Sequence, residues 1–134
     1  MRVLIDTNIL ISAILNSKST PYMAFIKAVS YPNQGMICEQ NVDEIRRIFN
    51  RKFPQKIQAL EAFLSLALLT LEVIPIPIEE NCLEEKIRDV NDRPILRAAI
   101  YAKVDILLTG DKDFIESGLH TPKIMTASDF IKMN

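Results

Sequence analysis

The sequence is poor in the residues that build disulfide-rich and zinc-binding proteins. It contains two cysteines, Cys38 and Cys82, and one histidine, His120, among 134 residues. Two cysteines are too few for a disulfide framework or a cysteine-type zinc site. We therefore expect both cysteines to be buried as small apolar side chains. We expect His120 to be exposed, because it stands in a predicted loop.

Long hydrophobic runs are also missing. No continuous apolar stretch reaches the roughly 18 residues that a membrane-spanning helix needs. Asp6 interrupts the N-terminal apolar segment, which argues against a secretion signal. We therefore expect a cytoplasmic protein with no membrane contact.

An excess of positive charge is absent as well. The net charge is −1, from 16 basic and 17 acidic residues, whereas strong non-specific nucleic-acid binders carry a basic surplus. This balance does not exclude nucleic acid, because an acidic site filled by divalent cations presents a different charge. The chain also has no GxxxxGK[ST] loop, no Gly-x-Ser-x-Gly elbow and no Cys-His pairing. These absences argue against nucleoside-triphosphate chemistry and against the common nucleophilic hydrolases.

Short β-branched runs alternate with longer helical segments along residues 1–134, which the length predicts to form a single domain. Strands are expected at Val3–Ile5, Met36–Cys38, from Val73, at Asp105–Thr109 and at Lys123–Thr126. Helices are expected at Ile9–Leu15, Tyr22–Ser30, Glu39–Asn50, Ile57–Leu71, Ile95–Lys103 and Ala127–Lys132, with a helical turn at Asn81–Ile87. Pro75 and Pro77 shorten the third strand and place it at a sheet edge. The alternation predicts a three-layer α/β/α fold with a mainly parallel central sheet.

Acidic residues stand where the expected strands end. Asp6 directly follows the first strand, and Asp111 follows the strand that ends at Thr109. Asp92 opens the helix that leads into that strand, and Glu44 lies in the helix after the second strand. Ligands of open α/β sheets bind outside the carboxyl ends of the strands. We therefore expect these four acids to converge at one edge of the sheet.

Each acid also has an explanation that involves no function. Asp6 or Asp92 could cap a helix, which is worth about 1 kcal/mol. Glu44 could pair with Arg47, three residues later, for about 0.3 kcal/mol, and Asp111 could be an ordinary turn residue. Together, these explanations require four unrelated acids at the same end of one sheet. Crowded carboxylates repel one another, and hard cations such as Mg²⁺ or Mn²⁺ relieve that repulsion, so the pattern favours a metal site.

Four motifs, in this order and spacing, resemble the PIN-domain ribonucleases. They are Leu4-Ile-Asp-Thr-Asn8, Asp43-Glu-Ile45, Asp92 before Ile95-Leu-Arg-Ala-Ala99, and Leu108-Thr-Gly-Asp-Lys-Asp-Phe114. The chain is similar in particular to the bacterial and archaeal branch of toxins from toxin–antitoxin systems. This resemblance implies a Mg²⁺- or Mn²⁺-dependent endoribonuclease that cuts single-stranded or loop RNA and leaves the phosphate on the 5′ side. It also implies two partners, an antitoxin protein and a second copy of the chain.

The resemblance assigns roles to individual residues. The implied catalytic residues, which also hold the metal, are Asp6, Glu44, Asp92 and Asp111, with Asp113 as a further metal ligand. The implied supporting residues are Asn8 and Thr109. Two positions depart from the family pattern, because Cys38 stands where Ser is frequent and Val90 replaces a proline. The second departure leaves open whether Asp89 or Asp92 faces the metal, and the adjoining helix start favours Asp92.

Three arginines of the third expected helix are candidates for holding the RNA backbone near Glu44. They are Arg46, Arg47 and Arg51. A solvated charged face explains them equally well, since phosphate contacts need basic residues but exposed basic residues need no phosphate.

Two other functions remain open. A haloacid-dehalogenase-like phosphatase also has Asp at the end of strand one and a late Gly-Asp pair such as Gly110-Asp111. That chemistry needs a second Asp two residues after the nucleophile, where this chain has Asn8. The other alternative is a non-catalytic PIN-like module that binds protein.

Overall fold

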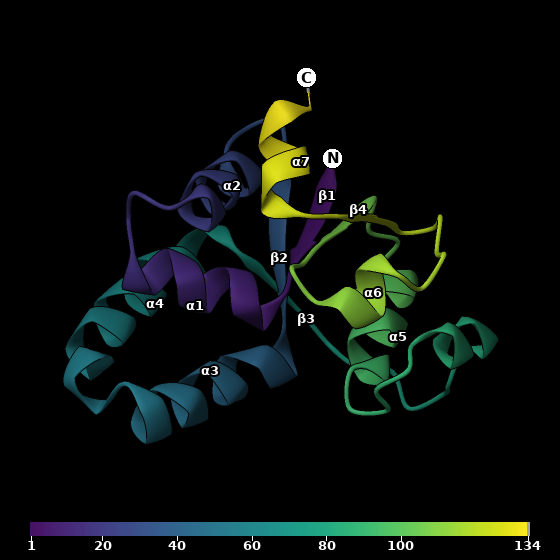
Figure 1. The fold of residues 1–134 in the computed structure, drawn as a ribbon, viewed down its shortest axis with the longest axis horizontal. Helices are drawn as coiled ribbons and strands as arrows, with labels where there is room; N and C mark the ends of the chain where they lie inside the picture. The colour runs from purple at the N-terminus through teal and green to yellow at the C-terminus, as the bar shows by residue number, and fades with distance from the viewer. Residues whose placement is uncertain (134) are drawn as a thin grey trace.

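The structure is a computed structural model that describes residues 1–133, and its centre is a five-stranded, wholly parallel sheet (Figure 1). The strands are β1 (Arg2–Ile5), β2 (Gln34–Cys38), β3 (Glu72–Ile74), β4 (Ile106–Leu108) and β5 (Lys123–Met125), and their order is β3-β2-β1-β4-β5. The α-helices are α1 (Thr7–Leu15), α2 (Thr20–Val29), α3 (Glu39–Lys52), α4 (Ile57–Thr70), α5 (Arg93–Tyr101), α6 (Lys112–Ile115) and α7 (Ala127–Lys132). Two 3₁₀ helices complete the described chain, η1 (Pro54–Lys56) and η2 (Cys82–Lys86). The predicted α/β class and the predicted layers are therefore confirmed, and the sheet is parallel throughout.

The central strand β1 is paired on both sides and carries the site at its end. Leu4 of β1 pairs with Met36 of β2 and with Leu107 of β4. All three side chains are fully buried, as expected for a parallel strand covered on both faces. β3 lies at one edge, as Pro75 and Pro77 predict, because proline cannot donate to a further strand.

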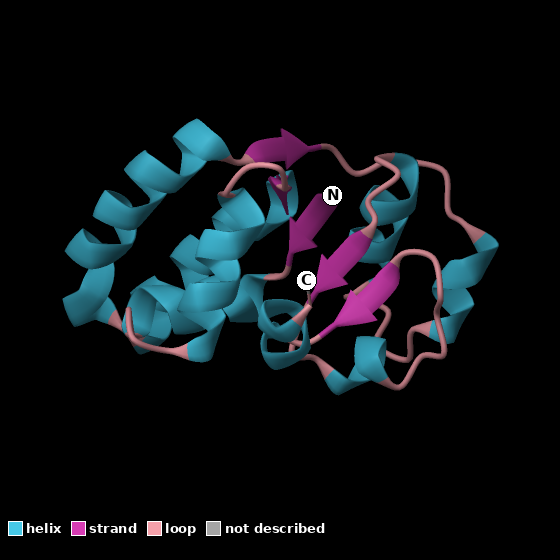
Figure 2. Ribbon diagram, turned by 90° about the horizontal axis from the view of Figure 1, so that it is seen from above, coloured by secondary structure: helices cyan, strands magenta, loops and turns pink. Residues whose placement is uncertain are grey.

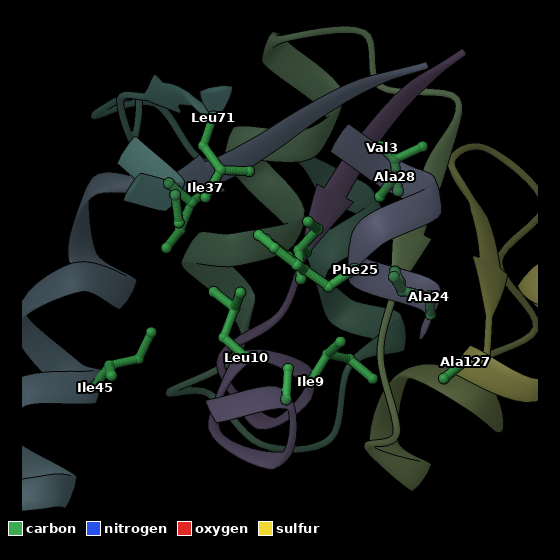
Figure 3. Close-up of a cluster of buried hydrophobic side chains, with 14 of the residues drawn as sticks. Val3, Ile9, Leu10, Ala24, Phe25, Ala28, Ile37, Ile45, Leu71 and Ala127 are labelled. Carbon is green, nitrogen blue, oxygen red and sulfur yellow. The ribbon is translucent and has the colours of Figure 1, made fainter. Parts of the chain in front are cut away.

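Helices cover the two faces of the sheet unequally. Alternate residues of β1 point to opposite faces, so Val3 and Ile5 join one buried cluster while Leu4 joins the other. The larger cluster is covered by α1, α2, α3, α4 and α7, and Figure 3 shows Leu10, Phe25 and others within it. The smaller cluster is covered mainly by α5. Figure 2 shows the strands between these two groups of helices.

The small side chains of α5 bring it close to the sheet. Ala98 and Ala99 are both fully buried in the smaller cluster, beside Leu96. Burial of a side chain such as Leu96 contributes roughly 1.5–3 kcal/mol to the free energy of unfolding. Because α5 is held firmly, the position of Asp92, its N-cap residue, is held as well.

The two cysteines differ in exposure. Cys38 ends β2 and is buried as predicted, and burial raises the pKa of its thiol. The prediction that Cys82 is buried is wrong, because this residue begins η2 in the surface connection between β3 and α5. His120 is exposed, as predicted.

The helices of residues 1–133 are all too short or too polar to cross a membrane.

Candidate metal site

Asp6 lies at the junction of β1 and α1, where the chain turns from the sheet into a helix. Its side chain is only 6% exposed. One carboxylate oxygen accepts a hydrogen bond from the backbone N–H of Thr7 at 2.8 Å, and the other accepts one from the Thr109 hydroxyl at 2.7 Å. Burial, together with the nearby carboxylates of Glu44 and Asp111, raises the pKa of Asp6 to about 6. A helix cap alone would have no need of such neighbours.

Thr109 links the ends of β1 and β4. It is fully buried, and its hydroxyl donates to Asp6 while accepting a hydrogen bond from the backbone N–H of Asp111 at 3.0 Å. Asn8 makes a second link, because its side-chain oxygen accepts a hydrogen bond from the N–H of Gly110 at 3.3 Å. Both residues therefore hold the loop that carries Asp111 against the strand that carries Asp6.

Two substitutions of Thr109 separate the contribution of its hydroxyl group to stability from that of its methyl group. Thr109→Val leaves a buried carboxylate oxygen and a backbone N–H without their partner, so we expect the free energy of unfolding to fall by about 1–3 kcal/mol. Thr109→Ser keeps the hydroxyl and should lose less. Chemical denaturation of the three proteins measures the difference. A larger loss for Thr109→Ser than for Thr109→Val would mean that packing of the methyl group, rather than the hydrogen bonds, matters at this position.

Asp92 and Asp111 approach each other from α5 and from the loop after β4. The Asp92 carboxyl makes no hydrogen bond to its own helix, so it is not a side-chain cap. Burial, a hydrogen bond to the Asp111 carboxyl and the negative charge of Asp111 raise the pKa of Asp92 to about 7. Two carboxyl groups close enough to share a hydrogen bond require a proton or a cation between them.

Glu44 faces the same region from α3. Burial raises the pKa of its carboxyl, and the Arg47 guanidinium partly opposes that shift. The positive charge of Arg47 therefore offsets only part of the pKa shift that burial causes at Glu44.

One cavity of about 130 Å³ collects the four acids that the sequence predicts to converge. Its lining residues are Asp6, Thr7, Asn8, Ile11, Glu44, Ile48, Asp92, Ile95 and Asp111. The hydroxyl of Thr7 is buried in this lining and has no hydrogen-bond partner. An unpaired buried hydroxyl costs free energy, so the cavity offers a place for a polar ligand. Sequence reasoning missed Thr7, and its position between Asp6 and Asn8 was the available signal.

A tighter group of acids lies next to this cavity. The carboxylates of Asp89, Asp92 and Asp113 each offer one oxygen within 4.8 Å of the others. Asp92 therefore belongs both to the cavity and to this group. Asp89 and Asp92, the two alternatives for the metal ligand, both offer an oxygen to this group. Asp113 lies in the group and outside the cavity lining, and its carboxylate is paired with Arg88.

The donor set fits a hard divalent cation. The acids at the site offer carboxylate oxygens, and the neighbouring side chains add a hydroxyl and an amide oxygen. Oxygen ligands of this kind suit Mg²⁺ or Mn²⁺. Burial first, and then the neighbouring carboxyls, raise the pKa values of Asp6 and Asp92, and a bound cation would offset both effects. The acidic group at Asp89, Asp92 and Asp113 can therefore hold a metal ion.

The three arginines of α3 do not share one environment. Arg46 donates from Nε to Glu61 at 3.0 Å and lines a different hollow, between α3 and α4. Arg47 and Arg51 are exposed, and Arg47 lies near enough to Glu44 to lower the pKa of that carboxyl. Arg47 thus lies beside an acid of the cavity, whereas the guanidinium of Arg46 is held at Glu61.

Comparison with known families finds one that spans most of the chain. A family model described as a PIN domain matches residues 2–113, a range that contains every acid of the site. No curated protein matches the chain in sequence.

Two solved structures share the fold. The first is VapBC2 from Rickettsia felis, bound to a DNA fragment from its promoter, with a TM-score of 0.69 and 21% identity over 94% of this chain and 98% of that one. The second is VapC20 from Mycobacterium tuberculosis, a toxin that cleaves the sarcin–ricin loop, with a TM-score of 0.59 and 16% identity over 87% of this chain and 95% of that one. The chain therefore has the fold of VapC toxins.

Proposed function

The chain belongs to the PIN domain family, and from that premise we propose that it is a Mg²⁺- or Mn²⁺-dependent endoribonuclease that hydrolyses RNA phosphodiester bonds. The observation that carries this proposal is the convergence of Asp6, Glu44, Asp92 and Asp111 on one cavity. Two of these carboxyls have pKa values raised to about 6 and about 7. Such a site gains stability from a cation and has oxygen ligands to offer it.

We propose that five acids hold the metal. They are Asp6, Glu44, Asp92, Asp111 and Asp113, with Asp89 as a further candidate. A divalent cation held by these residues would lower the pKa of a coordinated water and neutralise charge that develops on the phosphate. The chain itself supplies orientation, because Thr109 and Asn8 join the strand that carries Asp6 to the loop that carries Asp111.

Substrate binding is proposed on α3. Arg47 and Arg51 continue the helix stripe of Glu44 at three and seven residues, and both are exposed. Guanidinium groups in this position would bind phosphates on the RNA strand that enters the cavity. Arg46 can join them only by leaving Glu61.

The partners proposed here follow the structural relatives. VapC20 is a toxin that cleaves the sarcin–ricin loop, and we propose single-stranded or loop RNA as the substrate class of this chain. VapBC2 is bound to a DNA fragment from its promoter, and for this chain we propose an antitoxin protein and a second copy of the chain as partners, and a toxin as its role.

A cleavage assay with two substrate classes tests this proposal. We expect the purified protein to cut single-stranded RNA with Mg²⁺ or Mn²⁺, to leave 5′-phosphate ends, and to stop when chelator is added. We expect no phosphate release from small phosphomonoesters, because the second aspartate of a haloacid-dehalogenase-like phosphatase is replaced by Asn8, whose side-chain oxygen is bonded to Gly110. Monoester turnover through a covalent aspartyl-phosphate would support the phosphatase instead. Metal binding without turnover of either substrate would favour a non-catalytic module.

A further inference from the structure

We propose that Arg88 is a phosphate-binding residue of this site, which exchanges its ion pair with Asp113 for a phosphate of the bound RNA strand. The inference deepens the proposed ribonuclease function and rests on it for the identity of the ligand. It concerns a side chain that neither the sequence motifs nor the family match assigns to the site.

Arg88 lies one side chain away from the acidic group. Its Nε is 3.0 Å from a carboxylate oxygen of Asp113, and its Nη2 is 3.6 Å from Glu116. Asp113 in turn lies within 4.8 Å of Asp89 and Asp92, measured between carboxylate oxygens. The guanidinium therefore stands at the border of the acidic group.

The ion pairs of Arg88 are exposed and exchangeable. The side chain of Arg88 is 65% exposed, and those of Asp113 and Glu116 are 28% and 54% exposed. Exposed ion pairs contribute about 0–1 kcal/mol, so little holds the guanidinium on Asp113. A cation bound by the acidic group would compete with the guanidinium for that carboxylate, which frees Arg88 for another anion.

The backbone on both sides of Arg88 is held in place by hydrogen bonds, whereas its side chain is exposed. The neighbouring Ile87 is fully buried, and its carbonyl accepts a hydrogen bond from Nε of Arg93 at 3.0 Å. On the other side, the N–H of Asp92 donates to the carbonyl of Asp89 at 3.0 Å. Arg88 is thus a long cationic side chain on an anchored loop, which lowers the entropic cost of ordering it on a ligand.

Other arginines outside α3 are committed to the fold. Arg97 makes two hydrogen bonds to the buried carboxylate of Glu84, at 2.9 and 3.1 Å. Arg2 donates twice to the carbonyl of Ala102 at the opposite edge of the sheet. Arg88 differs from both because it is bound only to exposed carboxylates.

A phosphate is the ligand that this arrangement fits. Guanidinium groups bind phosphate oxygens in a bidentate manner. In this structure, the guanidinium of Arg88 pairs with the carboxylate of Asp113. Arg47 and Arg51 belong to α3, whereas Arg88 belongs to the loop before α5, and Figure 1 shows α3 at the left and α5 at the right of the view. An RNA strand across the cavity would then be held from both sides, which sets the reacting phosphate over the acids.

The test is the affinity for a fluorescent single-stranded RNA, measured by anisotropy in Ca²⁺, an oxygen-binding cation, with gels run to correct for any cleavage. Arg88→Ala should weaken binding about tenfold. It should also reduce the slope of log affinity against log salt by about 0.7, the value for one phosphate on a single strand. Arg88→Lys should keep the salt slope of the wild type but bind more weakly, because it retains the charge and loses the bidentate geometry.

Lys123→Ala is the matched control. It removes the same charge from an exposed residue at the start of β5, whereas the acids of the site follow the ends of the strands. It should change the affinity by less than about twofold. Arg88→Ala with wild-type affinity and salt slope, or with losses equal to those of Lys123→Ala, would overturn the inference.

The two proposals fail differently. If the wild type binds RNA and Arg88→Ala weakens binding, but Mn²⁺ produces no cleavage, the inference stands as a binding role while the ribonuclease proposal fails. If the wild type cleaves RNA and Arg88→Ala binds equally well, only the inference fails. A wild-type protein that binds no RNA would overturn both.

Discussion

Asp6→Asn should reduce metal-dependent RNA cleavage by about a thousandfold or more, because loss of a metal ligand removes several kcal/mol of stabilisation from the transition state. Asp6 is the acid at the centre of the site, at the end of the middle strand β1. The substitution keeps the size of the side chain and an oxygen that can accept from Thr109. It removes the negative charge that a cation requires.

The variant should remain folded. The raised pKa of Asp6 indicates that its charge is unfavourable in this environment, and removing that charge should offset the hydrogen bond from Thr7 or Thr109 that the amide nitrogen cannot accept. Circular dichroism and thermal melting in chelator check this point. Glu72→Gln is the control, since it also neutralises one carboxylate but lies at the start of edge strand β3, in an exposed pair with Arg2. Cleavage by Asp6→Asn at a rate near that of Glu72→Gln would remove Asp6 from the catalytic site.

The second large effect concerns stability without metal. In chelator, the free energy of unfolding should fall as the pH rises from about 4 to about 8, the range of the shifted carboxyl groups. The pKa of Asp6 is raised from 3.8 to about 6, and that of Asp92 from 3.8 to about 7. The folded protein therefore holds more protons than the unfolded chain within this window. The stabilisation from protonated Asp6 and Asp92 is complete below the ordinary pKa and is lost as the pH passes the raised values.

The size of this effect follows from the shift. For Asp6, which is almost fully buried, a shift of this size corresponds to about 3 kcal/mol. Mn²⁺ should reverse the loss at neutral pH, because an ion that binds only the folded protein stabilises it, by about 2.7 kcal/mol at a hundred times its dissociation constant. Thermal melting at several pH values, in chelator and then in Mn²⁺, measures both effects.

Asp92→Asn tests whether the pH dependence of stability and the effect of Mn²⁺ come from the acidic site rather than from the rest of the protein. It removes one of the two carboxyls that share a hydrogen bond, so we expect a smaller pH dependence and, at neutral pH in chelator, a melting temperature no lower than that of the wild type. Mn²⁺ should stabilise this variant less than the wild type. The Glu72→Gln control should behave like the wild type in all conditions. A wild-type melting temperature that Mn²⁺ leaves unchanged up to millimolar concentration would mean that these acids form no metal site.

Local sequence was enough to predict most of the fold. The apolar runs of β1 and β4 are continuous because both faces of a parallel strand are buried, so strands at Val3–Ile5 and Asp105–Thr109 could be predicted without tertiary information, and the second is observed as Ile106–Leu108. The prolines after β3 marked an edge strand for a reason that is equally local. Asp6 and Asp111 could be placed at one sheet edge because each directly follows a parallel strand. Helix ends were less accurate; α3, for example, continues to Lys52.

The tertiary structure decided how the side chains meet, because their partners are far apart in the chain. The hydrogen bond from Thr109 to Asp6 joins residues 103 positions apart. The pairing of Arg46 with Glu61 depends on how α3 packs against α4, and the exposure of Cys82 depends on a loop with no periodic pattern. The role proposed for Arg88 also depends on the tertiary structure. Its sequence position reveals a charge beside Asp89, but only the folding of α6 against that loop brings Asp113 to its guanidinium.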